Sequence, residues 1–554
     1  MNTKFFIKNS STKTLCFIFF LCLCIIIVCG FIGYIYQSDF GRVSIDRITV
    51  KNYNDLKIAA KLFGPQSPAS SKYPGILYIH GYQSCRETND PYCIELARRG
   101  FAVLSIDAIG RGNSDVDLQD LREDFDTTYG AESSLKYLKS LSFVNKDEIG
   151  LMGHSLGASI AYDMAIKDSS VNALTIVGNG YKDNVTIRRP KNMLMIFGRW
   201  DEFRRRMTQT SNFYKEWMSS HRTKKAFPIP HPQFGAIYGN FEDGTARMVF
   251  VPETIHILET HSHKAIAEAL IWMKKALSPP SDLWIDQNKQ IWHIKEWCSL
   301  LAMIICFFSI IPLSICIFRI PFFRSLTIST DFQYIYTCPK KDRRKFYFLN
   351  SILIWLYIPS ILIIFGIHKY ILRIDFAFPL MVVNAIVWWF LLSNTIGFIL
   401  FKRWYRKISN HVNLYDLGIS FARVKFQLDW IILWKTIFLA SILFCCVYLI
   451  ETLLEAVFLM DFRFIFSFAN DLTPYRFLLF LQYIPFLIVG FLFNGMFLHG
   501  QMRKSKKNTW LLTFVSSAVY NLKIMITPFI ILLIIQYLPL FIFGYVPFTG
   551  PGDM

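Results

Sequence analysis

Seven long apolar runs limit what this chain can fold into more than any other feature. The first extends from Leu15 to about Tyr36 and follows Lys4, Lys8 and Lys13. Runs of this length can cross a hydrocarbon core of ~30 Å as helices. The sequence therefore predicts an N-terminal membrane anchor and, much later in the chain, a membrane domain. The six later runs lie near 298–318, 346–366, 376–401, 430–450, 477–498 and 522–546.

The runs divide the chain into three expected parts. Residues 1–37 form an N-terminal tail and anchor, residues 38–290 a separate domain, and residues 291–554 a membrane domain with about six helices. A cleaved signal peptide is the alternative for the first run, but that run exceeds a usual signal core and no small-x-small cleavage site follows it. Hydrophobic residues make up 53% of the chain and charged residues 18%. This composition is typical of a water-exposed domain averaged with lipid-facing helices.

Positive charge is concentrated in the loops between the apolar runs. Arg319–Lys345 contains seven Lys or Arg residues, Lys402–Lys425 six and Arg503–Lys507 four. If the protein lies in the cell membrane, the positive-inside rule places these loops and the N-terminus on the cytoplasmic side and residues 38–290 outside the cytoplasm. The side of the C-terminus stays open, because 510–521 is either an interfacial segment or part of another span.

The net charge of +19 does not indicate a nucleic-acid partner. Residues 38–290 hold similar numbers of acidic and basic residues, so the excess belongs to the membrane loops. No nucleic-acid-binding motif with interleaved aromatic residues occurs in that balanced segment. The expected partner is therefore the lipid bilayer rather than a nucleic acid.

Residues 38–290 show the pattern of an α/β domain. Short β-branched or apolar runs alternate with amphipathic stretches and turn residues. Because helical stretches separate the later strands, they suit a mostly parallel sheet with helices on both faces. The expected strands are Arg42–Val50, Lys57–Phe63, Gly75–Ile79, Ala102–Ile106, Ile149–Met152, Ala173–Val177, Met193–Phe197 and Met248–Val251.

Ser155 lies in the motif Gly153-His-Ser-Leu-Gly157, between an expected strand and a helical stretch. A serine in a sharp strand-to-helix turn needs small residues two positions away on either side, because larger side chains would collide with the turn. The bare five-residue pattern also occurs by chance. Its strand–turn–helix context favours a nucleophile.

Two further turns follow expected strands. The His80-Gly81-Tyr82 turn can offer the backbone N–H group of Tyr82 to a developing oxyanion, with the N–H group of Leu156 as the second donor. The second turn, Asp107–Ser114, has the pattern Asp-x-x-Gly-x-Gly-x-Ser. We interpret it as a tight loop that supports the site without taking part in chemistry.

In this order and spacing, the three motifs resemble the α/β-hydrolase family over roughly residues 42–277. The resemblance implies the α/β-hydrolase fold, here joined to an all-α transmembrane domain, and a chain order of serine, acid and histidine. The family's Gly-x-x-Asp acid position matches Asp201, which follows the strand Met193–Phe197. Glu202 and Asp183 are possible substitutes for it.

Three histidines precede the last helix of the domain, expected at Ala265–Leu277. The strand leading into Pro252-Glu-Thr-Ile-His256 resembles the family's strand–loop–histidine segment, which favours His256. His261 and His263 suit a helix cap or contact with solvent, although His263 remains a second candidate. Together with Ser155 and Asp201, His256 completes a Ser-Asp-His triad.

Such a triad predicts a serine hydrolase that attacks an acyl carbon and needs no cofactor. No CxxC, HExxH or similar spacing occurs, so the sequence gives no support for a metal site. Only 46 positions separate Ser155 from Asp201, which leaves little room for a lid and resembles the compact dienelactone-hydrolase-like branch. Cys85 and Cys93 either pair, if this domain faces an oxidising compartment, or are free thiols.

These features favour a carboxylic ester hydrolase acting on ester or acyl substrates, lipids among them. The Arg204-Arg-Arg206 run would favour an anionic or phospholipid-like substrate, but such runs are more often solvated surface. An acyltransferase or a peptidase could use the same residues. A transport or sensory protein with a ligand-binding hydrolase-like domain is a further alternative, although the spans lack the dense row of ionisable residues typical of transport pathways.

Overall fold

The structure is a computed structural model of the 554-residue chain. It describes residues 12–66, 72–117, 125–210, 212–327, 336–371, 377–464, 470–504 and 510–547. Lys4 and Lys8 of the predicted cytoplasmic tail, and the last two lysines of the third basic loop, lie outside this part. The chain forms two compact units. The sheet unit lies within Cys24–Ile305 and Leu449–Asp471, and the helical unit lies within Met1–Leu23, Cys306–Tyr448 and Leu472–Pro551.

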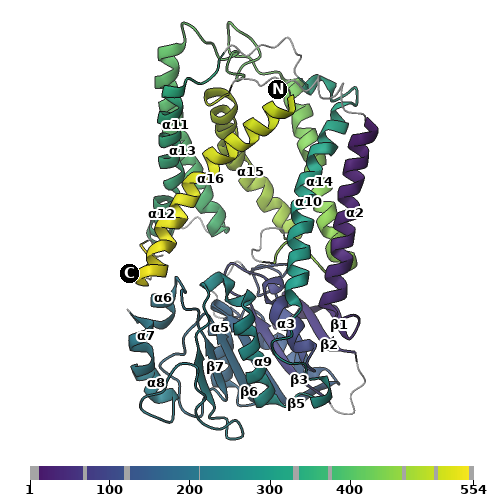
Figure 1. Ribbon diagram of the computed structural model, residues 1–554, viewed down its shortest axis with the longest axis vertical. Helices are drawn as coiled ribbons and strands as arrows, with labels where there is room; N and C mark the ends of the chain where they lie inside the picture. Colours follow the sequence, from purple (N-terminus) through teal and green to yellow (C-terminus); the bar gives the residue numbers. More distant parts are fainter. Residues whose placement is uncertain are drawn as a thin grey trace. The chain divides into compact units, whose positions relative to one another are not determined.

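An eight-stranded sheet is the centre of the sheet unit (Figure 1). Each strand overlaps one of the eight segments that the sequence predicts, so all eight expected strands are confirmed. The strands are β1 (Val43–Lys51), β2 (Lys57–Pro65), β3 (Tyr73–Ile79), β4 (Ala102–Ile106), β5 (Val144–His154), β6 (Val171–Val177), β7 (Met193–Ile196) and β8 (Arg247–Phe250).

The strands follow the order β1-β2-β4-β3-β5-β6-β7-β8. β1 pairs with β2, and β2 with β4, in antiparallel register. All pairings from β4 through β3 to β8 are parallel, which confirms the mostly parallel sheet. The carboxyl ends of these six strands therefore meet at one edge, where side chains from distant parts of the sequence come together.

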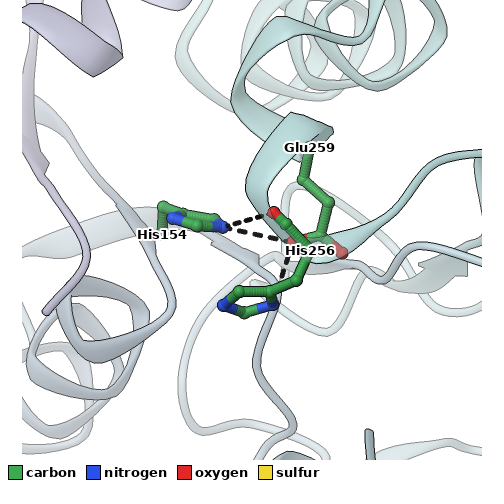
Figure 2. A group of neighbouring side chains, drawn as sticks. All are labelled: His154, His256 and Glu259. Carbon is green, nitrogen blue, oxygen red and sulfur yellow. Dashed lines mark hydrogen bonds and ion pairs between the residues drawn. The ribbon is translucent and has the colours of Figure 1, made fainter. Parts of the chain in front are cut away.

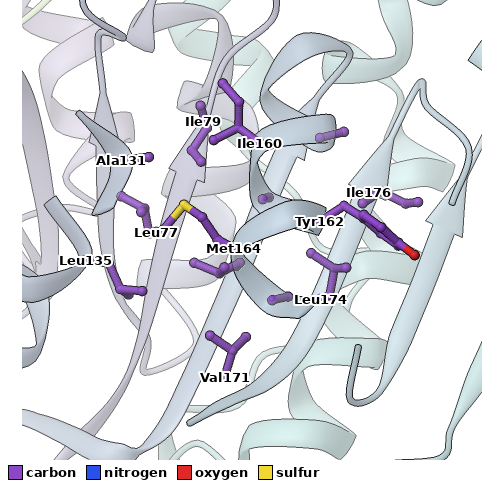
Figure 3. Close-up of a cluster of buried hydrophobic side chains, with 14 of the residues drawn as sticks. Leu77, Ile79, Ala131, Leu135, Ile160, Tyr162, Met164, Val171, Leu174 and Ile176 are labelled. Carbon is purple, nitrogen blue, oxygen red and sulfur yellow. The ribbon is translucent and has the colours of Figure 1, made fainter. Parts of the chain in front are cut away.

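Helices cover both faces of the sheet, and β3 shows how the sequence encodes this. Leu77 and Ile79 point to one face and pack in the cluster drawn in Figure 3. Ile76 and Tyr78 point to the opposite face, as the period-2 alternation of a strand requires. Both sets are fully buried, so β3 reads as an uninterrupted apolar run.

The first face is covered by α4 (Ala131–Ser140) and α5 (Leu156–Lys167), and the second by α3 (Asp90–Ala97) and α9 (His263–Leu277). The other helices between β1 and Ile291 are short. They are η1 (Arg86–Asn89), α6 (Arg204–Thr208), α7 (Phe213–Glu216), η2 (Trp217–Ser219), α8 (His221–Ala226), η3 (His256–His261) and η4 (Ser281–Leu283).

Within the described ranges, seven helical stretches are long and apolar enough to cross a membrane. Each overlaps one of the seven predicted runs. Residues 510–521 form the start of the last helix rather than a separate interfacial element. The stretches are formed by α2 (Thr12–Gln37), α10 (Trp292–Phe318), α11 (Lys340–Trp355) with α12 (Tyr357–Tyr370), α13 (Met381–Ile408), α14 (Trp430–Phe458), α15 (Pro474–Gly495) with η6 (Met496–Gln501), and α16 (Trp510–Phe543); η5 (Arg324–Leu326) is a short turn.

Candidate active site

The residues that the sequence singles out lie at the carboxyl edge of the parallel strands. Ser155 follows β5 directly, Asp201 lies in the loop after β7, and His256 begins η3 in the loop after β8. All three side chains are buried. The loop after β6 also contacts the Ser155 turn, because Asn179 donates a hydrogen bond from Nδ2 to the carbonyl oxygen of Ser155 (2.9 Å).

The Ser155 turn is strained in the way that its motif predicts. Ser155 has φ +54° and ψ −112°, a conformation that residues with a Cβ atom rarely adopt. A Cβ atom on Gly153 would lie 2.3 Å from the backbone of Gly157, and one on Gly157 would lie 2.1 Å from the carbonyl oxygen of Ile79. Both glycines are therefore required, since β5, β3 and α5 approach one another too closely for any side chain.

His256 is held by Asp201. The distance from Nδ1 of His256 to Oδ2 of Asp201 is 2.7 Å, and because a carboxylate only accepts, Nδ1 carries the proton and donates it. This leaves Nε2 of His256 as the nitrogen that can take up a proton. Burial alone would lower the pKa of His256, but the charge of Asp201 and this hydrogen bond outweigh it and raise the pKa above its ordinary value.

The substitute acids occupy other places. Glu202 binds His256 through the backbone, accepting its N–H group at Oε2 (3.0 Å). Asp183 forms a surface ion pair with Arg222 (2.9 Å). The acid hydrogen-bonded to the His256 ring is thus Asp201.

The alternative histidines also have other partners. Nδ1 of His261 lies 2.8 Å from the hydroxyl of Thr260. His263 begins α9, and its ring packs on Trp292 with 5.1 Å between ring centres. His263 is the first residue of α9, and Ser262 rather than His263 caps the helix.

The turn after β3 lies beside Ser155. A Cβ atom on Gly81 would come within 3.4 Å of the Cβ of Ser155. Nε2 of His80 accepts a hydrogen bond from the backbone N–H group of Ala108 (3.0 Å), so Nδ1 is protonated and donates to the carbonyl oxygen of Gly81 (2.7 Å). Burial lowers the pKa of His80 to about 4, which keeps this ring neutral and the turn fixed at neutral pH.

Glu259 is a residue of the site that the sequence interpretation missed. It is fully buried, and Figure 2 shows its carboxyl group between His154 and His256. Oε2 lies 3.3 Å from Nε2 of His154 and 3.7 Å from Nδ1 of His256, while Oε1 accepts the N–H group of Gly198 at 2.5 Å. Burial and the negative charge of Asp201 raise the pKa of Glu259 well above its ordinary value. The signal available in the sequence was that Glu259 follows His256 by three residues, within one helical turn.

Among the residues that the structure describes, three groups of side chains have ligand atoms within 4.8 Å of one another and so could hold a metal ion: His154, His256 and Glu259; Cys85, Glu87 and Asp107; and Glu87, Glu455 and Asp461. In the first group, Asp201 already binds His256. In the other two, arginines neutralise the carboxylates. Hydrogen bonds and ion pairs therefore account for this geometry. Cys85 and Cys93 are buried free thiols, the second of the two alternatives for them.

Comparison with known proteins agrees with this architecture. A family model described as serine aminopeptidase, S33, matches residues 74–228, which include the turn after β3, the Ser155 turn and Asp201. The sheet unit has the α/β-hydrolase fold. We refer to it below as the hydrolase unit.

Two curated relatives match parts of the chain. The uncharacterized protein YcjY of Escherichia coli is 29% identical over 153 residues, covering 25% of this chain and 50% of YcjY. The uncharacterized protein PA2218 of Pseudomonas aeruginosa is 22% identical over 174 residues, covering 29% of this chain and 47% of PA2218. The chain thus spans about half the length of each relative.

Similar solved structures include PA2218 itself and two esterases. PA2218 is 14% identical, with a TM-score of 0.31, over 43% of this chain and 94% of its own. A bacterial heroin esterase is 14% identical, with a TM-score of 0.31, and the match covers 43% of this chain and 85% of the esterase. Esterase LipW from Mycobacterium marinum is 14% identical, with a TM-score of 0.32, and the match covers 44% of this chain and 86% of LipW.

Proposed function

We propose that this protein is a membrane-anchored serine hydrolase that cleaves carboxylic esters. The observation that carries the proposal is the strained Ser155, with φ +54°, at the same strand edge as the hydrogen-bonded pair His256 and Asp201. Backbone strain at a serine in a strand-to-helix turn is typical of a catalytic nucleophile. The hydrolase family match supports the reaction class.

Each group has a distinct role in the proposed reaction. Nε2 of His256 takes the proton of Ser155 as its oxygen attacks the acyl carbon, and then passes that proton to the leaving alcohol. Asp201 holds the imidazole in the required tautomer and stabilises its charged form. The backbone N–H groups of Tyr82 and Leu156 bind the oxyanion of the tetrahedral intermediate. Water then repeats the sequence on the acyl-enzyme, so the triad itself calls for no cofactor.

A fluorophosphonate probe tests the nucleophile directly. The purified full-length protein should be labelled at one site, and the Ser155→Ala variant should not be labelled. Labelling that persists in Ser155→Ala would contradict the assignment. Absence of labelling in both proteins, with the wild type folded, would instead favour a ligand-binding domain without chemistry.

Peptide bond cleavage is the second candidate, because the family model that matches residues 74–228 is described as a serine aminopeptidase. Hydrolysis of p-nitrophenyl esters and of amino-acid p-nitroanilides by the same preparation distinguishes the two. We expect the esters to be cleaved and the anilides not. Acyl transfer would show as a rate that rises with added alcohol.

Placement of the hydrolase unit outside the cytoplasm is part of the same proposal and is supported by the three basic loops. Lys136 on α4 has a side chain that is 73% exposed. A cysteine at this position should react with a membrane-impermeant maleimide in intact cells. Reaction only after permeabilisation would place the unit on the cytoplasmic side.

Glu259 provides a test of the site's charge at neutral pH. Its raised pKa favours the neutral, protonated form of Glu259, which glutamine resembles in shape and charge. We expect kcat/KM of Glu259→Gln to stay within about threefold of the wild type. A change of this size is expected when a hydrogen bond worth about 1 kcal/mol is kept with poorer geometry. The pH profile of kcat/KM should superimpose on that of the wild type between pH 6 and 8. A shifted profile would mean that Glu259 is charged beside His256.

A further inference from the structure

A short segment after α14 is buried inside the hydrolase unit. Met460, Asp461, Phe462 and Arg463 are each 0–2% exposed, and they belong to the hydrolase unit although they lie far along the chain from its sheet. Charged residues are almost never fully buried unless they are paired. We call Glu455–Phe464, the end of α14 with the residues that follow it, the insert segment.

Arg463 is the centre of these contacts. Its guanidinium group lies 2.6 Å from Oδ2 of Asp461, 3.4 Å from Oε1 of Glu87 and 3.5 Å from Oε1 of Glu455. Nη1 also donates to Oδ1 of Asn113 (2.9 Å). One planar group thus binds three carboxylates and an amide, which the forked geometry of arginine allows and that of lysine does not.

The contacts of Arg463 extend to the turn that carries Tyr82. Its carbonyl oxygen accepts the thiol of Cys85, with the sulfur 3.6 Å away. Next along the chain, Arg86 donates to Asp107 from its backbone N–H group (2.8 Å) and from Nη1 (3.2 Å). Nη2 of Arg86 binds Oε1 of Glu455 (3.1 Å). The insert segment therefore holds the far end of the turn that starts at His80 and passes Ser155 at Gly81.

A second set of contacts holds the neighbouring turn, Asp107–Ser114. Asn113 binds Arg463 and also donates from Nδ2 to Oδ2 of Asp471 (2.6 Å). On β2, Nζ of Lys61 donates to the carbonyl oxygen of Leu459 (3.2 Å). These links join residues more than 340 positions apart and all reach the carboxyl ends of β3 and β4 or the adjacent β2.

Charge makes this arrangement sensitive to the loss of Arg463. Burial alone would raise the pKa of Glu87, but Arg463 and Arg86 hold it well below its ordinary value, so that Glu87 is ionised. Removing one partner of a buried ion pair leaves an unpaired charge, which the surroundings relieve by moving. Among the carboxylates that bind Arg463, Glu87 lies at the end of the Tyr82 turn, so a shift of Glu87 would also shift this turn.

We propose that Arg463 is a positioning residue of the hydrolase: with Glu455 and Asp461 it fixes the 81–87 turn so that the N–H group of Tyr82 points at the developing oxyanion. This rests on the function proposed above. The segment between two predicted membrane helices is then part of the catalytic unit rather than a connector. Arg463 contacts neither substrate nor the reacting atoms and acts only through the turn.

The main test is Arg463→Lys in the full-length protein in detergent micelles, with Arg247→Lys as the matched control. Arg247 is also a fully buried arginine, but it binds the carbonyl oxygens of Ala246, Ile187 and Pro190 at the other end of β8. Lysine keeps the positive charge in both variants. The measurements are kcat and KM per active site titrated with fluorophosphonate, the rate constant of that labelling, and Tm.

For Arg463→Lys we expect kcat and the labelling rate to fall about tenfold, with KM within about threefold, because a misdirected oxyanion donor loses part of the 10²–10³ in kcat that such donors supply. For Arg247→Lys we expect Tm to fall while kcat per titrated site stays within twofold of the wild type. If Arg463→Lys behaves like Arg247→Lys, the role of Arg463 is structural only and the inference is wrong.

A double variant, Arg463→Met with Glu87→Gln, separates charge balance from positioning. It removes the arginine and the carboxylate together, so its Tm should exceed that of Arg463→Met alone. Its kcat per titrated site should still be at least tenfold below that of the wild type. Recovery of both Tm and kcat would overturn the positioning role. Absence of labelling in the wild type would defeat the proposed function itself, an outcome distinct from labelling that Arg463→Lys leaves unchanged.

Discussion

Replacement of Asp201 by asparagine is expected to lower kcat by about 10⁴ while leaving the fold and KM nearly unchanged. The amide can donate a hydrogen bond to Nδ1 of His256, which then carries no proton, so that the proton moves to Nε2. The nitrogen that should receive the proton of Ser155 is then already occupied. The loss should appear in steady-state ester hydrolysis and in the rate of fluorophosphonate labelling.

Glu202→Gln is the matched control for Asp201→Asn. Glu202 is the next residue, and its carboxylate accepts the backbone N–H group of His256 rather than binding the ring. The amide oxygen of glutamine can accept the same bond, so kcat should stay within about tenfold of the wild type. If Glu202→Gln lost as much activity as Asp201→Asn, Glu202 would be the acid of the triad.

Gly157→Ala is expected to reduce kcat/KM more than about 10²-fold, because the nucleophile cannot keep its position once the turn moves by an ångström. The new Cβ atom would lie 2.1 Å from the carbonyl oxygen of Ile79 and 2.5 Å from that of His80. Both are backbone atoms of the strand end that supports Ser155. The free energy of unfolding should also fall by about 1–3 kcal/mol, as for other overpacked sites.

Gly64→Ala provides the comparison in the same sheet. Gly64 lies in β2, and a Cβ atom there would meet Ser44 Oγ at 3.5 Å, an ordinary contact. Denaturant unfolding and kcat/KM of this variant should match those of the wild type closely. An active Gly157→Ala protein would show that β3 and α5 do not approach as closely as the structure has them.

Most of the sheet could be predicted because its signals are local. Each strand from β3 to β8 contains a short apolar run, such as Ile149–Met152 within β5, and such runs are recognised without knowledge of their neighbours. The glycine requirement at 153 and 157 follows from the motif itself. The contact between Asp201 and His256 came from the order implied by the family resemblance, and the structure brings these two side chains together. Their catalytic roles remain proposals.

The residues that the sequence did not reveal depend on contacts between distant segments. Glu259 lies on a short turn, and it is buried because the ends of β5, β6 and β7 meet it there. Arg463 reads as a solvated charge in a loop between two spans. Its partners, Glu87 and Asn113, are more than 340 residues away, and no pattern within the loop indicates that it is buried.

The order of synthesis gives the burial of Arg463 a consequence for biogenesis. The ribosome makes the eight strands first, then residues 306–448 of the helical unit, and only then the insert segment. Domains tend to fold as they emerge, N-terminal parts first. Here Glu87, Arg86 and Lys61 can pair early with one another and with nearby carboxylates. Their contacts with the insert segment form only later. The nascent hydrolase unit is thus incomplete until the insert segment at the end of α14 has been made. A chain that stalls before that point would lack the contacts that fix the Tyr82 turn, and under the proposed function its kcat would be lower than that of the finished protein.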